Sequence, residues 1–218
     1  MSQTEDYPGQ RVTIVNDGKR CIHSRYCVLN LNSVFLPNVD GPWIKPDAAD
    51  HETVMAVVEK CPSGALRYVA GEGASPEQPP TVNTVRVWEN GPLAFHGELD
   101  IKGDTSSFRA TLCRCGLSKR KPFCDHSHAE GGFAATGEPE TKDTPTLAVR
   151  NGPLKITPTR DGPLMVEGAL EICAASGRTV SRVTKTWLCR CGHSKDKPFC
   201  DGSHKKAGFT DPGDLPTD

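Results

Sequence analysis

One cysteine-rich stretch occurs twice in the chain, and this duplication limits the possible folds more than any other feature. Residues 113–128 read CRCGLSKRKPFCDHSH and residues 189–204 read CRCGHSKDKPFCDGSH, with 13 of the 16 positions identical. The flanking sequence repeats as well, because residues 97–101 return in similar form as residues 168–172. We therefore expect two similar domains that arose by duplication.

Each copy carries four potential metal ligands in the pattern C-x-C-x8-C-x3-H. Two cysteines that lie one residue apart do not sensibly form a disulfide with each other, but their thiolates can bind one metal ion or two adjacent ions. On spacing alone, Zn²⁺ held by three cysteines and one histidine competes evenly with an iron–sulfur cluster. The positions are Cys113, Cys115, Cys124 and His128 in the first copy, and Cys189, Cys191, Cys200 and His204 in the second.

The composition favours several small pieces over one large core. Only 36% of the residues are hydrophobic, and 21 Gly and 18 Pro indicate many turns. The net charge of −1, with both signs interspersed, argues against a nucleic-acid or membrane surface. No apolar run approaches the ~18 residues of a membrane span, and no secretory signal precedes the cysteines. We expect a soluble protein of the reducing cytoplasm.

Two segments rich in Pro, Gly and Glu, residues 71–80 and 137–145, have little to bury and are interpreted as linkers. They divide an α+β chain into a first domain and the two repeats. Val85 and Val87 alternate with Arg86 and Trp88 before Asn90-Gly91, which predicts a hairpin, and Asn151-Gly152 is expected to repeat that turn. The expected domains are residues 1–70, 81–136 and 146–210, followed by a tail at 211–218.

In the first domain, Arg11–Val15 is expected to form a strand. Asp47 is a candidate N-cap for a helix of about 12 residues that ends at Cys61-Pro62. Cys21, Cys27 and Cys61 are the candidate ligands of a third site, for which a zinc site or three unrelated buried cysteines are the alternatives.

The motif Cys200-Asp201-Gly202-Ser203-His204, with the upstream Cys-x-Cys and Lys-Pro-Phe-Cys, resembles the CDGSH iron–sulfur (mitoNEET-like) family. The resemblance implies a [2Fe–2S] cluster in each copy, with the Cys-x-Cys pair on the inner iron and the later Cys and His on the outer iron. Family members usually pair as homodimers that share a strand-exchanged β-cap. A chain with both motifs is therefore expected to be a monomer in which the repeats form an intramolecular pseudo-dimer.

The first copy departs from this family at His126. The family has glycine at this position, and so does the second copy, at Gly202. If the position needs a positive φ, His is one of the residues that tolerate it. His128 keeps the ligand role because it aligns with His204, and His193 is expected at the surface. Asp125 and Asp201 are expected to cap a helical turn rather than to act in catalysis.

Cys21, Cys27 and the distant Cys61-Pro62 resemble a divergent, small ferredoxin-like α/β domain with one cluster. The usual pattern of such ferredoxins has a further cysteine where Ser24 stands. Three cysteines suit a [3Fe–4S] cluster, and a [4Fe–4S] cluster would need His23, Ser24, water or another donor. Cys173 is left over and is expected to be a small buried side chain.

A [2Fe–2S] core held by three thiolates and a neutral imidazole carries one negative charge less than an all-cysteine site, so its potential should exceed that of a plant-type ferredoxin. The histidine also makes the outer iron labile in acid. We expect one-electron transfer with redox partner proteins, or cluster delivery to apo acceptors or redox and iron sensing as the alternatives. A zinc-stapled binding module is a further alternative. No nucleophile–base constellation or nucleotide fingerprint indicates an enzyme, and no catalytic residues are assigned.

Overall fold

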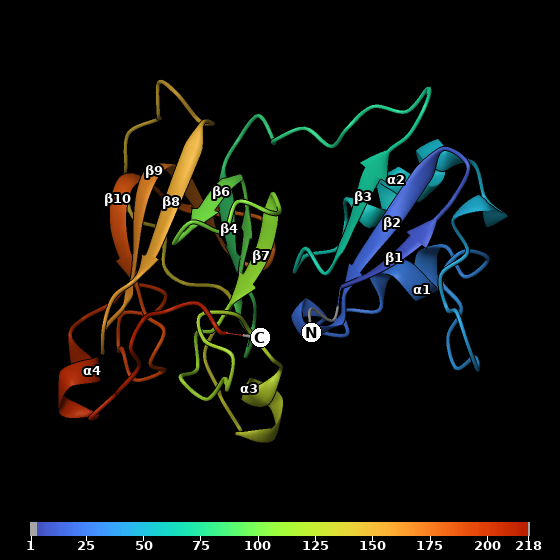
Figure 1. Ribbon diagram of the computed structural model, residues 1–218. Coiled ribbons are helices and arrows are strands. Elements are labelled where there is room, and N and C mark those ends of the chain that lie inside the picture. The colour runs from blue at the N-terminus through green and yellow to red at the C-terminus, as the bar shows by residue number, and fades with distance from the viewer. Residues whose placement is uncertain (1–3, 218) are drawn as a thin grey trace. The chain divides into compact units, whose positions relative to one another are not determined.

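The computed structural model describes residues 4–217, which form two compact units, residues 4–78 and residues 79–217 (Figure 1). Both units combine strands with a few short helices, so the chain is of the mixed α+β class. No helix among the described residues has the length and apolar character needed to cross a membrane.

The first unit is built on a three-stranded antiparallel sheet in the order β1-β2-β3. The central strand β2 buries Val12 and Ile14 on one face, and α2 packs Val54 and Val58 against them. The strand expected near residues 11–15 is confirmed. The elements are β1 (Thr4–Pro8), β2 (Val12–Asp17), β3 (Leu66–Ala70), α1 (Tyr26–Asn30), α2 (His51–Val58) and the 3-10 turns η1 (Gly18–Arg20) and η2 (Pro46–Ala48).

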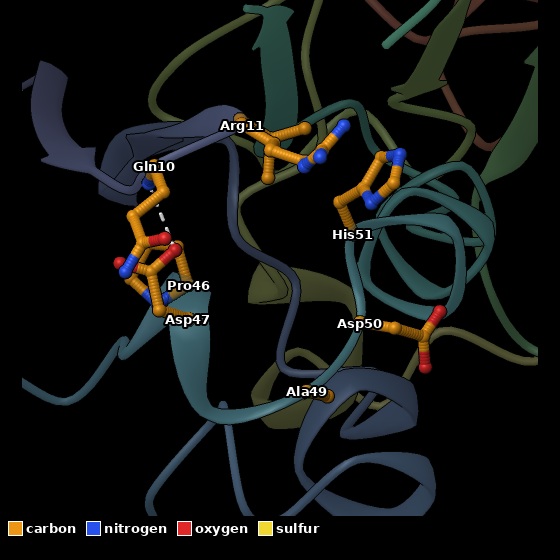
Figure 2. A pocket seen from close by; sticks show the side chains of 8 residues that line it. Gln10, Arg11, Pro46, Asp47, Ala49, Asp50 and His51 are labelled. Carbon is orange, nitrogen blue, oxygen red and sulfur yellow. Dashed lines mark hydrogen bonds between the residues drawn. The ribbon is translucent and has the colours of Figure 1, made fainter. Parts of the chain in front are cut away.

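The helix α2 is shorter than predicted, and Asp47 is not its cap. Asp50 caps the helix, because its carboxylate accepts the backbone N–H of Thr53 at 2.8 Å and the Thr53 hydroxyl at 2.7 Å. Asp47 lies in η2 and instead accepts the backbone N–H of Gln10 at 2.8 Å (Figure 2). Extended backbone at Ala49 separates the 3-10 turn from the helix, so the expected 12 residues become eight.

The second unit contains a seven-stranded sheet in the order β6-β8-β9-β4-β5-β7, with β10 paired to β9. The long strand β9 corresponds to β5 and β6 of the first repeat joined together. The first repeat supplies β4 (Thr84–Val87), β5 (Leu93–His96), β6 (Glu98–Ile101), β7 (Arg109–Leu112) and α3 (Ser127–Glu130), and the second supplies β8 (Pro153–Pro158), β9 (Leu164–Cys173), β10 (Thr179–Leu188) and α4 (Ser203–Lys206).

The two repeats exchange strand contacts reciprocally. Thr84 of β4 pairs in parallel with Glu171 of β9, and Lys155 of β8 pairs in parallel with Asp100 of β6. A shift of 71 residues converts one pair into the other. The inward-facing side chains of both repeats form one continuous core, which includes Val85, Phe95, Leu99, Leu154, Leu170 and Ile172.

The hairpin predicted at Asn90-Gly91 is present, because β4 and β5 pair antiparallel on either side of it and Asn90 has a φ of 49°. The expected counterpart at Asn151-Gly152 is wrong. The second hairpin turns at Asp161-Gly162, where Asp161 has a φ of 52° and β8 pairs antiparallel with β9. Asp tolerates the left-handed region much as Asn does, so Asp-Gly forms the same turn.

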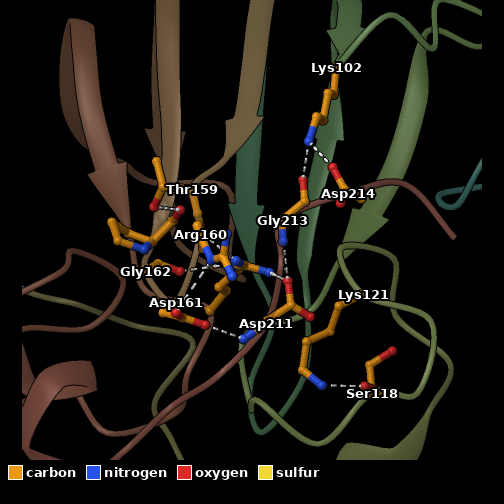
Figure 3. A network of polar contacts seen from close by, with 12 residues as sticks. Lys102, Ser118, Lys121, Thr159, Arg160, Asp161, Gly162, Asp211, Gly213 and Asp214 are labelled. Atoms are coloured by element: carbon orange, nitrogen blue, oxygen red, sulfur yellow. Dashed lines mark hydrogen bonds and ion pairs between the residues drawn. The ribbon is translucent and has the colours of Figure 1, made fainter.

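The segments that follow α3 and α4 contact both repeats, including the repeat that did not supply them. We name residues 137–145 the first strap and residues 211–217 the second strap. Glu138 of the first strap accepts the backbone N–H of Ser176 at 2.8 Å. In the second strap, the ammonium group of Lys102 reaches Asp214 and the carbonyl oxygen of Gly213 (Figure 3). Both straps lack regular secondary structure, yet polar contacts connect them to the sheet.

Candidate metal centres

A short antiparallel contact brings the first and last cysteines of each motif together. Leu112 and Phe123 form an isolated bridge, in which the backbone N–H of Cys113 donates to the carbonyl of Pro122 at 2.8 Å and that of Cys124 donates to Thr111 at 2.9 Å. The second repeat has the same arrangement between Leu188 and Phe199, next to Cys189 and Cys200.

The potential ligands of each repeat lie as two pairs. The sulfur atoms of Cys113 and Cys115 are 3.6 Å apart, and the Sγ of Cys124 is 3.4 Å from the Nδ1 of His128. The second repeat reproduces these distances, at 3.7 Å for Cys189 and Cys191 and 3.4 Å for Cys200 and His204. Within residues 4–217, no three or more His, Cys, Asp or Glu side chains surround a single ion position. Two donors for each of two adjacent irons is the arrangement that a [2Fe–2S] cluster requires, so these residues fit one.

The backbone supplies N–H groups to the sulfur atoms. Leu117 and His193 donate at 3.4 Å to Cys115 and Cys191, and His126 donates at 3.5 Å to Cys124. These donors offset the negative charge that thiolates and bridging sulfides concentrate in a cluster site.

The hydrogen bond within each Cys-x-Cys pair shifts the pKa values of its two sulfurs in opposite directions. The hydrogen bond from Cys115 lowers the pKa of Cys113, whereas the same bond raises the pKa of Cys115. In the second repeat, the equivalent hydrogen bond lowers the pKa of Cys189 and raises the pKa of Cys191. Each repeat therefore presents one sulfur that ionises easily and one that must lose its proton when metal binds.

A buried arginine stands between the two cysteines of each pair. Arg114 is 1% exposed and donates from Nε to the carbonyl of Gly91 at 2.9 Å, and its other nitrogens reach the carbonyls of Trp88, Ala135 and Thr136. Burial lowers the pKa of Arg114 to about 10. Arg190, also 1% exposed, bonds Gly162 in the same way and additionally pairs with Asp211. These arginines fix the hairpin turns against the metal-binding loops.

The loop within each motif is held by its own side chains. Ser118 donates to the carbonyl of Phe123 at 2.7 Å and accepts the backbone N–H of Arg120 at 3.0 Å. Asp125 accepts the backbone N–H groups of Lys119 at 2.8 Å and Ser127 at 3.1 Å, which agrees with its expected place at the start of a helical turn. Ser194 and Asp201 repeat these contacts.

The three cysteines of the first unit come from three different elements. Cys21 follows η1, Cys27 lies in the first turn of α1, and Cys61 follows α2. Burial raises the pKa of Cys27, and the nearby charges of Cys61 and Cys21 raise it further. Burial and then the charge of Cys61 also raise the pKa of Cys21, although no three His, Cys, Asp or Glu side chains among the described residues surround a single ion position.

Two polar side chains approach these sulfurs. The Nδ1 of His23 is 3.9 Å from the Sγ of Cys21, and the Oγ of Ser63 is 3.7 Å from the Sγ of Cys61. Ser24, the expected middle position, is exposed. The sequence interpretation missed Ser63, for which the turn-forming run Cys61-Pro62-Ser63-Gly64 was the available signal.

The comparison with known protein families agrees with this geometry. Residues 90–129 and 161–205 match the family described as "Iron-binding zinc finger CDGSH type". The chain therefore carries two segments of the CDGSH iron-binding family. The CDGSH matches span both candidate centres, and residues 7–71 match a second family, described as "Divergent 4Fe-4S mono-cluster". The chain is therefore an iron–sulfur protein, in which tandem CDGSH segments follow a domain of the 4Fe-4S type.

Two curated relatives are "Uncharacterized protein YjdI" of Escherichia coli strain K12 and the protein of the same name from Escherichia coli O157:H7. Each is 40% identical over 63 residues, which cover 28% of this chain and 80% of the relative. No solved structure matches the chain significantly.

Two clefts of about 200 Å³ lie apart from the candidate CDGSH and 4Fe-4S ligands. The first separates β2 from the start of α2, where Arg11 and His51 point toward one another (Figure 2). The second is lined by Arg150, Glu171 and Arg182. Glu171 accepts from Arg150 at 2.8 Å, which accounts for its charge in a buried position. The remaining cysteine, Cys173, is buried at the end of β9.

Proposed function

We propose that this chain is a monomeric electron-transfer protein of the cytoplasm that carries two [2Fe–2S] clusters. The arrangement of donors in two pairs per repeat, with one histidine in each outer pair, supports the proposal. One imidazole in place of a thiolate leaves the oxidised site with a net charge of −1, so it accepts an electron more readily than an all-cysteine site. Redox partner proteins would supply and remove the electrons.

The two CDGSH repeats would form an intramolecular pseudo-dimer with a shared β-cap. The reciprocal parallel pairs, Thr84 with Glu171 and Lys155 with Asp100, support this arrangement, because each repeat lends its first strand to the other. A single chain then contains the strand exchange that would otherwise require two separate chains. Light scattering should give the mass of one chain, and an obligate dimer would contradict the proposal.

The first unit would be a ferredoxin-like domain with a third cluster, [4Fe–4S] or [3Fe–4S]. The gathering of Cys21, Cys27 and Cys61 supports three thiolate ligands. A fourth iron would need a non-cysteine donor, and His23 and Ser63 are the side chains that approach the sulfurs. Replacing His23 with Ala should leave a [3Fe–4S] spectrum unchanged, whereas it should alter a [4Fe–4S] site that His23 completes.

The direct test of cluster content is an iron, sulfide and zinc assay with visible spectra before and after dithionite. Two [2Fe–2S] clusters and a third cluster give seven or eight sulfides per chain, whereas two [2Fe–2S] clusters alone give four. A red-brown protein that bleaches on reduction would support the proposal. A colourless protein that contains zinc would contradict it and leave a structural module.

A second candidate function is delivery of clusters to apo-proteins. The partial exposure of His128 and His204 favours it, because solvent and an acceptor can reach the outer iron. Replacing both histidines with Cys should lower the potential and slow both transfer and acid-induced loss. If the potential and the rates of transfer and acid-induced loss all stay unchanged, the assignment of histidine as a ligand is wrong.

A further inference from the structure

The two motifs differ next to the histidine ligand. His126 stands two residues before His128, whereas Gly202 stands two residues before His204. Both residues adopt the left-handed conformation, with φ of 73° for His126 and 84° for Gly202. The first repeat therefore places a full side chain where the second has none, on the same backbone.

The ring of His126 packs against the ring of the candidate ligand. The ring centroids of His126 and His128 are 4.7 Å apart with an interplanar angle of 74°, an edge-to-face contact. At the second site, a Cβ added to Gly202 would meet no atom within 4 Å. The ring of His126 therefore covers one side of His128, whereas no side chain at Gly202 covers the equivalent side of His204.

The backbone arrangement around the histidine is the same in both repeats. The sulfur–imidazole distance is 3.4 Å in each, and the carbonyls of His128 and His204 accept the backbone N–H of Phe133 at 3.0 Å and of Phe209 at 3.1 Å. The ring at residue 126 is thus the main difference in direct contact with the ligand.

We propose that His126 makes the first CDGSH site the slower of the two to lose its cluster, so that the second site donates first. This inference rests on the proposed [2Fe–2S] clusters. His128 and His204 would each hold an outer iron, and loss of a cluster would require a water oxygen or an acceptor thiolate to replace the histidine nitrogen as the iron ligand. Transfer of the intact cluster to the cysteines of an acceptor would need no change in oxidation state. The packed ring restricts the swing of His128 away from the iron, which makes His126 a positioning residue.

The experiment follows the visible absorbance of the oxidised holoprotein at a fixed pH of about 8 in the presence of an excess of EDTA, which binds ferric iron. Apart from any loss from the third cluster, the [2Fe–2S] absorbance of the native chain should fall in two phases of comparable amplitude whose rates differ by about two- to tenfold, as expected for one aromatic contact. His126→Asn keeps a residue that tolerates positive φ but removes the ring, so the slow phase should become fast. Gly202→Asn is the matched control and should leave both rates unchanged.

Two further variants separate the ring from other effects. His126→Phe restores a ring without a nitrogen that binds metal and should return the slow phase, whereas Gly202→His should slow the fast phase. In the reduced protein with His204 replaced by Cys, pulsed electron paramagnetic resonance should still report an imidazole on iron when His126→Asn is added, which excludes His126 itself as the ligand.

The outcomes distinguish the inference from the proposed function. A protein without [2Fe–2S] absorbance would overturn both. If clusters are present but His126→Asn leaves the rates unchanged, or accelerates both phases equally, the inference is wrong and the proposed function stands.

Discussion

Cys115 and Cys191, the equivalent second cysteines of the two repeats, face each other across an isolated antiparallel bridge. The glycines that follow them have positive φ, 82° for Gly116 and 85° for Gly192. A Cβ on Gly116 would lie 2.5 Å from the carbonyl oxygen of Cys191, and one on Gly192 would lie 2.5 Å from that of Cys115. The two candidate centres therefore share a backbone contact that only glycine permits.

Replacing Gly116 with Ala should separate this contact and weaken both centres. The added methyl group meets backbone atoms, which cannot rotate away as a side chain end can. We expect a loss of about 2 to 3 kcal/mol in the free energy of unfolding, measured by chemical denaturation, and faster loss of both clusters. Gly103→Ala is the control, because Gly103 has a φ of 92° but an open surrounding. If the two variants are equally stable, the bridge is not important for stability.

Asp211 neutralises a buried charge, so its removal should be costly. It pairs with Arg190, whose side chain is fully buried, while the Asp211 side chain is 13% exposed. Asp211→Asn should lower the free energy of unfolding by about 3 kcal/mol, because it leaves the guanidinium without a counter-charge. Asp214→Asn, in the same strap, removes a 69% exposed carboxylate and should have little effect. Equal effects of the two variants on thermal unfolding would show that the strap, rather than the buried pair, matters.

Ser118 and Ser194 offer a matched test of the two loops. Each hydroxyl is buried, donates to the carbonyl of the phenylalanine in its loop and accepts a backbone N–H. Replacing either with Ala leaves both backbone groups unsatisfied and should destabilise the protein by about 1 to 3 kcal/mol. Each substitution should accelerate loss mainly from its own site, as measured by the two phases of chelator-induced bleaching. Equal acceleration of both phases by each variant would contradict this independence.

Acid should weaken the first unit through Asp50. Hydrogen bonds from the Thr53 backbone N–H and hydroxyl hold the pKa of Asp50 below its ordinary value. A carboxylate with a lowered folded-state pKa stabilises the protein above its unfolded pKa of about 3.9, and this contribution disappears as the pH falls through the folded value.

Asp50→Asn keeps a good N-cap but removes the ionisable group. The stability of the first unit should therefore depend less on pH in this variant between about pH 2 and 5, as measured by hydrogen exchange of the α2 amides. An unchanged pH dependence would show that other groups dominate.

The family of the two cysteine-rich loops could be predicted from the sequence, because the residues of each motif lie close together in the chain. The hairpin was predicted correctly in the first repeat but not in the second. Asn151-Gly152 has the same amino acids as Asn90-Gly91, but the turn with the same conformation is Asp161-Gly162. The stretch from Ile172 to Leu188 is five residues longer than the equivalent stretch from Ile101 to Leu112, which changes the offset from 71 to 76 and obscures this alignment. Asp47 and Asp50 are equally good N-cap candidates in the sequence. The extended backbone at Ala49, which starts the helix after Asp50, decides between them.

The straps could not be predicted from composition. Residues 137–145 contain few apolar side chains, so they resemble a linker. Their role depends on polar contacts with residues far along the chain, such as the carboxylate of Glu138 with Ser176 and Arg178. Hydrogen bonds of this kind leave no periodic pattern in a sequence.

The reciprocal pairing of β4 with β9 and of β8 with β6 joins both halves of the sheet in one polypeptide. In a two-fold homodimer every amino-acid change appears twice, once in each copy. Here His126 and Gly202 are encoded separately, so one half can change while the other keeps its original chemistry. Because both repeats lie in one chain, their metal-binding sites can evolve different properties, which the sites of identical subunits cannot.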